Sequence, residues 1–103
     1  MKFGAYIFPT DYSIAPAELG QAMEERGFES VFFTEHTHIP AGRITPYAVS
    51  EELPREYHDV LDPFVALAAV AAVTERLRLG TGVCLVVEHH PITLAKTVAT
   101  LDV

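Results

Sequence analysis

The sequence predicts an α/β fold with the element order βαβαβα and a parallel sheet. Three apolar stretches have the length and composition of strands, and they lie at residues 2–8, 30–34 and 77–83. Each is followed by a segment whose apolar residues recur with helical spacing. Strands that alternate with helices in this way pair in parallel, and near-continuous apolar strands favour a sheet that is covered on its faces.

The first helix is predicted after the turn signal Pro9-Thr10-Asp11. Pro16 suits a first helical turn, where its missing N–H costs nothing, and either Ser13 or Ala15 is the expected cap. Gly27 stands where a helix C-cap is expected. Between these ends, one core-facing stripe has the spacing i, i+3, i+4 and i+7, formed by Leu19, Ala22, Met23 and Arg26.

The second and third helices have clear start signals. Asp62-Pro63 combines an N-cap acid with proline at the first helical position, and the run 64–73 that follows is apolar nearly all round. Pro91 opens the third helix. Three βα units cannot close an eight-stranded barrel, so the chain is either a small open sheet or the front part of a larger fold.

A long connection, residues 35–61, separates the second strand from the second helix. Connections of that length are uncommon in compact domains and are usually functional or disordered. It contains three prolines and a glycine, together with an acidic patch at Glu51, Glu52, Glu56 and Asp59. We predict that it forms a loop over the crevice at the carboxyl ends of the strands.

Composition excludes several function classes. The 103 residues make one domain's worth of chain or less, and the formal charge is −7, from 14 acidic against 7 basic residues. This balance argues against nucleic-acid partners and against an anionic membrane surface. Cys84 is the single cysteine, so no internal disulfide can form, and the apolar run 62–73 is too short to span a bilayer. The amino terminus does not have the pattern of a signal peptide, so a cytoplasmic protein is expected.

The residues that promise chemistry follow the predicted strands. Glu35 and His36 come directly after the second strand, and Gly80 and Gly82 lie in the third. In parallel α/β proteins the carboxyl ends of the strands line the ligand crevice. The structural alternative is that Glu35 is a solvated strand end, that His36 has a partner in a loop, and that the glycines only relieve crowding.

A metal site is a second hypothesis. His36 and His38 have the spacing of two ligands on one side of an extended chain, and Glu35, His89 or His90 could complete the set. Such a pair resembles that of the metal-dependent amidohydrolases, so a metal-dependent hydrolase stays open. Cys84 has no adjacent base and is expected to be inert. A third hypothesis is a non-enzymatic α/β fragment that self-associates through its sheet edges.

An ordered set of motifs carries a resemblance over essentially the whole chain. Its parts are Lys2-Phe3-Gly4 with Phe8-Pro9-Thr10, Glu35-His36, the run 78–83, and the run 90–96. Together they resemble the luciferase-like monooxygenase family, and most closely its branch that uses the deazaflavin coenzyme F-420. The resemblance implies a TIM barrel, of which residues 1–103 would be the first three βα units in a single partial domain.

The resemblance also implies a site. Thr81, Gly82 and Val83 would back the ring of coenzyme F-420, or of FMN as second choice, with a non-proline cis peptide between Gly82 and Val83. Glu35 and His36 would contact the coenzyme and act in catalysis, with His36 as proton donor, acceptor or anchor on the substrate side. The implied reaction is hydride transfer to or from a small organic substrate, or its oxygenation, with no resident metal. A homo-oligomer stays open.

Overall fold

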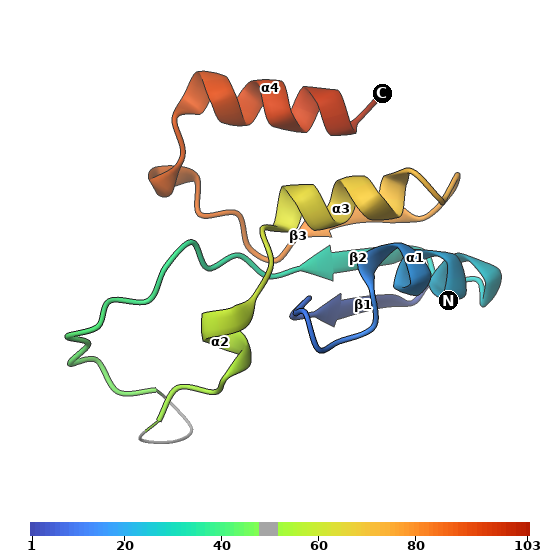
Figure 1. The fold of residues 1–103 in the computed structure, drawn as a ribbon. Coiled ribbons are helices and arrows are strands. Elements are labelled where there is room, and N and C mark those ends of the chain that lie inside the picture. Colours follow the sequence, from blue (N-terminus) through green and yellow to red (C-terminus); the bar gives the residue numbers. More distant parts are fainter. Residues whose placement is uncertain (48–51) are drawn as a thin grey trace.

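The computed structural model describes residues 1–47 and 52–103. Its sheet has three parallel strands in the order β1 (Gly4–Ile7), β2 (Ser30–Phe33) and β3 (Arg78–Thr81) (Figure 1). The predicted helices are α1 (Pro16–Glu25), α3 (Pro63–Ala71) and α4 (Pro91–Leu101), and each follows one strand. The predicted βαβαβα order and parallel sheet are therefore confirmed. Two short elements were not predicted: the helix α2 (Glu56–Asp59) and the 3₁₀ turn η1 (Val86–Glu88).

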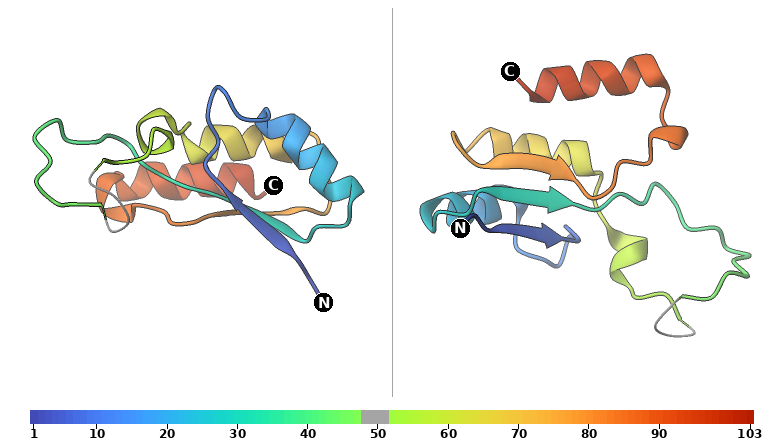
Figure 2. Two further views of the ribbon diagram at one scale, coloured as in Figure 1. Left: turned by 90° about the horizontal axis from the view of Figure 1, so that it is seen from below. Right: turned by 180° about the vertical axis from the view of Figure 1, so that it is seen from behind.

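The spatial order of the strands is the same as their order in the chain. Each crossover therefore steps to the next strand in the same direction, and connections of one hand then place their helices on the same face. Figure 2 shows α1 and α3 together on one side of the sheet. This is the arrangement at the start of a TIM barrel, in which the helices form an outer layer.

The core lies between the sheet and these helices. Val31 and Phe33 are fully buried against Leu67 and Val70 of α3. The opposite face is open, because Tyr6 is 57% and Phe32 is 41% exposed. The prediction of a sheet covered on its faces is therefore wrong for the described residues. The strands are apolar on both faces, but the helices cover only one; in a closed barrel the second face would be the interior.

Local signals set the helix ends as predicted. The Asp62 carboxylate accepts a hydrogen bond from the Val65 backbone N–H at 2.9 Å and so caps α3. Ala15 takes the N-cap position of α1, while the Ser13 hydroxyl bonds to the Thr10 backbone instead. Gly27 has φ +75°, the left-handed conformation that glycine adopts most readily after a helix.

Two contacts tie α1 to the segment around α3. A Cβ on Gly20 would lie 2.6 Å from Val70 Cγ1, so the glycine allows the two helices to approach closely. The Glu24 carboxylate accepts hydrogen bonds from the backbone N–H groups of Arg76 at 2.7 Å and Leu77 at 2.9 Å, and also from that of Glu75. These bonds lower the pKa of Glu24, with the Arg76 N–H the strongest contributor. They hold the turn that enters β3.

None of the helices in residues 1–47 and 52–103 has the length and apolar character that a membrane crossing requires.

Candidate functional site

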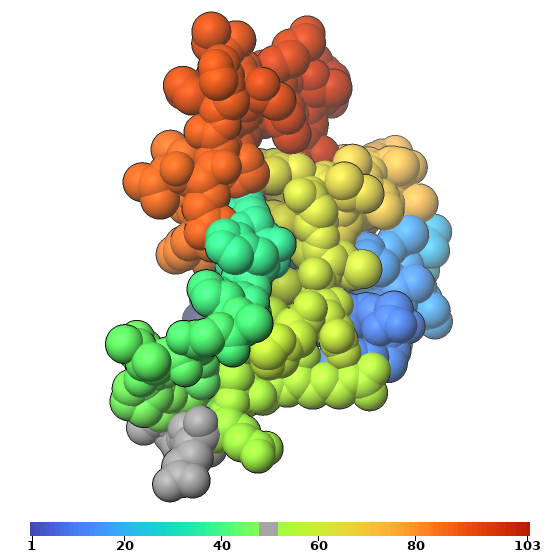
Figure 3. Space-filling model, turned by 60° about the vertical axis from the view of Figure 1, so that its left-hand side comes forward, coloured from blue at the N-terminus to red at the C-terminus, as the bar shows by residue number. Residues whose placement is uncertain are grey.

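The candidate site lies where the segments that follow β2 and β3 meet. The backbone N–H of Gly82 donates to the Phe33 carbonyl at 2.7 Å, so the pairing of the two strands continues past the end of β3. Thr37 and Glu88 are hydrogen-bonded through their side chains. In the space-filling view the segment after β2 lies against the segment that carries η1 (Figure 3). The predicted functional residues, which come from separate parts of the sequence, thus lie at the same edge of the sheet.

Glu35 is buried between these two segments. Its side chain is 1% exposed. Its Oε2 accepts a hydrogen bond from the Leu85 backbone N–H at 2.5 Å, and its Oε1 lies 2.5 Å from Nε2 of His89. The alternative of a solvated strand end is therefore wrong. Successive residues in an extended chain alternate in direction, so Glu35 points to the same side as the buried Val31 and Phe33.

Cys84 lies beside the Glu35 carboxylate. Burial raises the pKa of the Cys84 thiol, and the negative charge of Glu35 and a hydrogen bond to it raise this pKa further. The environment thus favours the protonated thiol over the nucleophilic thiolate. This agrees with the prediction that Cys84 is unreactive as a nucleophile.

His36 points away from Glu35 and joins a cluster of aromatic rings. Its ring is stacked with Phe8 at 6.1 Å between centroids and contacts Tyr57 of α2 at 4.8 Å. The Tyr57 hydroxyl donates to the Tyr47 hydroxyl at 3.4 Å, and this bond is the main reason that the pKa of Tyr57 is raised to about 12. His36 is half-buried and, together with Asp62, also lines a pocket of about 240 Å³.

Gly80 in β3 and Gly82 just after it lie against aromatic rings on the open face of the sheet. A Cβ on Gly82 would lie 2.6 Å from the Tyr6 ring, and a Cβ on Gly80 would lie 2.5 Å from the Phe32 ring. Both glycines therefore make room for an aromatic neighbour. The peptide bond between Gly82 and Val83 is cis, the conformation that the family resemblance implies.

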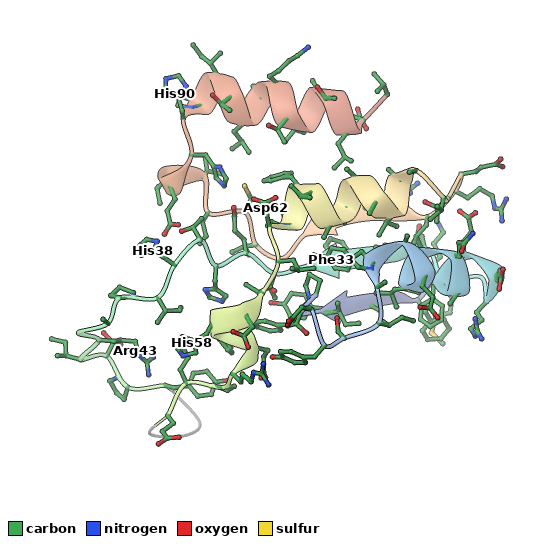
Figure 4. The ribbon with its side chains drawn as sticks, in the orientation of Figure 1. Phe33, His38, Arg43, His58, Asp62 and His90 are labelled. Carbon is green, nitrogen blue, oxygen red and sulfur yellow. The ribbon has the colours of Figure 1, made fainter. Side chains whose placement is uncertain are left out.

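The proposed ligand pair of His36 and His38 does not join the added ligands Glu35 and His89 in one cluster within the described residues. His38 is exposed and its Nδ1 bonds to the neighbouring Thr37 hydroxyl. Figure 4 shows His38 on the segment after β2, His58 on α2 and His90 at the start of α4. Within residues 1–47 and 52–103, the group whose ligand atoms come together is instead Glu35, Cys84 and His89.

The long connection is only partly a loop. It runs outward beyond the strand ends and returns through α2, whose Tyr57 contacts His36 (Figure 1). The Leu61 N–H then donates to the Pro9 carbonyl at 2.8 Å. Of the acidic patch, Glu51 lies outside the described residues, and Asp59 pairs with Arg55. That this connection covers a ligand crevice stays a prediction.

Sequence reasoning missed the partners of the two central side chains. From the sequence, His89 is predicted only as a candidate added metal ligand, and no pattern singles out Tyr57. Both lie far from their partners along the chain, and neither belongs to a motif with a recognisable spacing. The one available signal was position, because His89 follows β3 just as Glu35 follows β2.

With this geometry in view, comparison with known proteins decides the family. The family model for luciferase-like monooxygenase matches residues 14–103. The chain belongs to the luciferase-like monooxygenase family. Uncharacterized proteins of Mycobacterium bovis and of two strains of Mycobacterium tuberculosis are each 46% identical to it over 105 residues. The alignments cover 99% of this chain but 37% of each relative, so the chain spans well under half the length of the curated relatives it matches.

Proposed function

We propose that this chain is part of an oxidoreductase that holds the deazaflavin coenzyme F-420, with FMN as second choice, at the carboxyl ends of its strands. The reaction would be hydride transfer to or from a small organic substrate, or its oxygenation. Membership of the luciferase-like family supports an oxidoreductase or monooxygenase role. The observation that carries the proposal is the open wall formed by residues 80–83 and the aromatic rings beside them.

The residues present fit a flat ring system. Tyr6 and Val83 are 57% and 66% exposed, and both lie beside the backbone of Gly82. With the Tyr6 ring packed on Gly82, the two residues present an uncharged surface against which a flat ring can lie. When bound, the coenzyme would supply the carbon that accepts or donates the hydride.

The chain's own residues would orient the ring, exclude water and manage the proton. Thr81, Gly82 and Val83 would back the ring. Ring contacts lead from Tyr6 through Phe8 to His36, and they support a role for the imidazole at the rim of this wall. An imidazole there can hold or release a proton at a ring nitrogen near neutral pH, as general acid/base work requires.

Glu35 would act from behind the wall. Its carboxylate holds the Leu85 N–H and the His89 ring, and so fixes the segment that carries Val83. These buried contacts favour a positioning role. That Glu35 also contacts the coenzyme or acts in catalysis stays a prediction.

The test is a fluorescence titration of the polypeptide that carries this chain, with coenzyme F-420 and FMN in parallel. We expect saturable binding, tighter for the deazaflavin. Gly82→Ala should weaken binding about tenfold or more, the equivalent of about 1.4 kcal/mol, because the added methyl group displaces Tyr6. His58→Ala on α2 is the control. A complete barrel that begins with this sequence and binds neither coenzyme would refute the proposal.

The alternative of a metal-dependent hydrolase with His36 and His38 gains no support from the arrangement of the described residues, because His36 stacks on Phe8 while His38 faces outward. A cytoplasmic location and a small-molecule substrate stay predictions of the sequence.

A further inference from the structure

Three side chains of different chemistry meet behind the proposed coenzyme wall. One ligand atom each from Glu35, Cys84 and His89 lies within 4.8 Å of the other two. We propose that these residues form a binding site for a single divalent transition-metal ion, with Zn²⁺ as the best match. The site does not depend on whether a coenzyme binds.

The first argument is the charge of Glu35. Its carboxylate is almost completely buried, and its ion-pair partner within the described parts of the chain is His89 rather than a lysine or arginine. Buried charges in proteins are paired or coordinate metals, because an isolated charge loses too much solvation energy. A cation bound between Glu35 and His89 would compensate the charge of the buried carboxylate.

The second argument is the ligand set. A thiolate sulfur, an imidazole nitrogen and a carboxylate oxygen are the three donor types that Zn²⁺ accepts in tetrahedral sites. Mg²⁺ and Ca²⁺ prefer oxygen donors alone and would gain nothing from Cys84 or His89. Three protein ligands leave a fourth position for water or another small donor.

Two of the three ligands are oriented by their neighbours before any ion binds. The Leu85 N–H holds Oε2 of Glu35, which leaves Oε1 on the side of His89. The Phe64 ring packs edge-on against the His89 ring at 5.8 Å between centroids. In known metal sites, hydrogen bonds of this kind orient the ligands, and apolar neighbours limit the access of solvent.

Binding would exchange protons for the ion. The Cys84 thiol releases its proton to solvent, the neutral His89 offers the lone pair of Nε2, and the direct contact between Glu35 and His89 opens to admit the ion. The two negative ligands then balance the double positive charge. The ion would tie the end of β2 to the segment after β3.

The test is a titration of the metal-free chain with Co²⁺, a spectroscopic substitute for Zn²⁺. We expect one equivalent to bind, to produce a thiolate-to-cobalt charge-transfer band, and to be displaced by Zn²⁺. Cys84→Ser should remove the band. Cys84→Ser and His89→Ala should each weaken Zn²⁺ binding by at least about 10-fold to 100-fold, the loss that removal of a mere orienting partner of a ligand typically causes. His90→Ala is the matched control, because His90 is the exposed neighbour of His89 and lies outside the cluster.

Two titration results would overturn the proposal. One is the absence of stoichiometric Co²⁺ or Zn²⁺ binding. The other is binding that survives Cys84→Ser but falls with His90→Ala, which would indicate ordinary surface histidines. A second measurement needs no variant: Zn²⁺, but not Mg²⁺, should slow alkylation of Cys84 in the unmodified chain about tenfold or more, and an unchanged rate would equally reject the site. Titrations with coenzyme F-420 and FMN in the presence of a metal chelator test the proposed function without the metal ion. A failure of the metal site can therefore be told apart from a failure of the proposed function.

Discussion

The contact between Glu35 and His89 should make a measurable contribution to stability in the metal-free chain. Replacing His89 with leucine removes one partner of the buried Glu35 carboxylate and leaves the Leu85 N–H and the Cys84 thiol. A buried polar group that loses a partner costs about 1–3 kcal/mol, and a buried charge costs more. His89 is 22% exposed through its side chain, so water can partly replace it. We therefore expect His89→Leu to lower the free energy of unfolding by about 2–3 kcal/mol.

The assay is a double-mutant cycle measured by urea unfolding, with far-UV circular dichroism as the probe, in the presence of chelator. Glu35→Leu and His89→Leu are made singly and together. Each single variant leaves the other member of the pair without its partner, whereas the double variant removes both members. The loss in free energy of unfolding of the double variant should therefore be smaller than the summed losses of the two single variants, by about 1.5 kcal/mol or more.

The matched control is the exposed pair of Arg55 and Asp59, whose Nε and Oδ2 atoms are 2.7 Å apart. Their side chains are 74% and 34% exposed, so solvent screens the pair and its coupling should be clearly smaller. The reasoning is refuted if the two cycles give the same coupling. It is equally refuted if His89→Leu leaves the free energy of unfolding unchanged.

Three further predictions concern the fold. Gly20→Ala should lower the free energy of unfolding, measured with urea, by about 1–3 kcal/mol, because the new methyl group meets Val70; this cost outweighs the better helix propensity of alanine. Adding Val70→Ala to this variant should recover part of the loss. A Gly20→Ala variant more stable than the unmodified chain would contradict the close approach of the two helices. The pKa of Glu24 is lowered in the folded chain, so its contribution to stability is present above the ordinary carboxyl pKa of 4.5 and is lost as pH falls through the folded value. Glu24→Gln should therefore make stability, measured by thermal unfolding at a series of pH values, less dependent on pH on the acid side. An unchanged pH dependence would argue against the hydrogen bonds from the backbone to Glu24. The open face with Tyr6 and Phe32 predicts concentration-dependent association of this chain by sedimentation, and a strictly monomeric chain across the dilution series would count against it.

Much of the fold was predictable because its signals are local. Asp62 and Pro63 specify a helix start through one side-chain bond and one fixed dihedral angle, and Gly27 specifies the end of α1 through its positive φ. These effects act within a few residues of the chain. The short helix α2 lacked such a signal, since no side chain caps it and Tyr57 packs on residues far away in sequence.

The candidate site was predictable in position but not in orientation. Residues after the ends of parallel strands must share one edge of the sheet, so Glu35, His36 and Gly82 were expected near one another. Which way each side chain turns depends on the alternation of the strand and on which face the helices cover. Glu35 turned inward to His89, and His36 turned outward to Phe8 and Tyr57.

The sequence by itself determined the βαβαβα order, the parallel sheet, the helix starts and the family resemblance, because each depends on residue types at short, regular spacings. Only the tertiary structure decided that one face of the sheet stays open and that Glu35, Cys84 and His89 meet. Such contacts join residues about fifty positions apart, and no local preference encodes them. They arise when packing of Val31 and Phe33 against the helices sets the register of β2 and directs Glu35 toward the segment after β3.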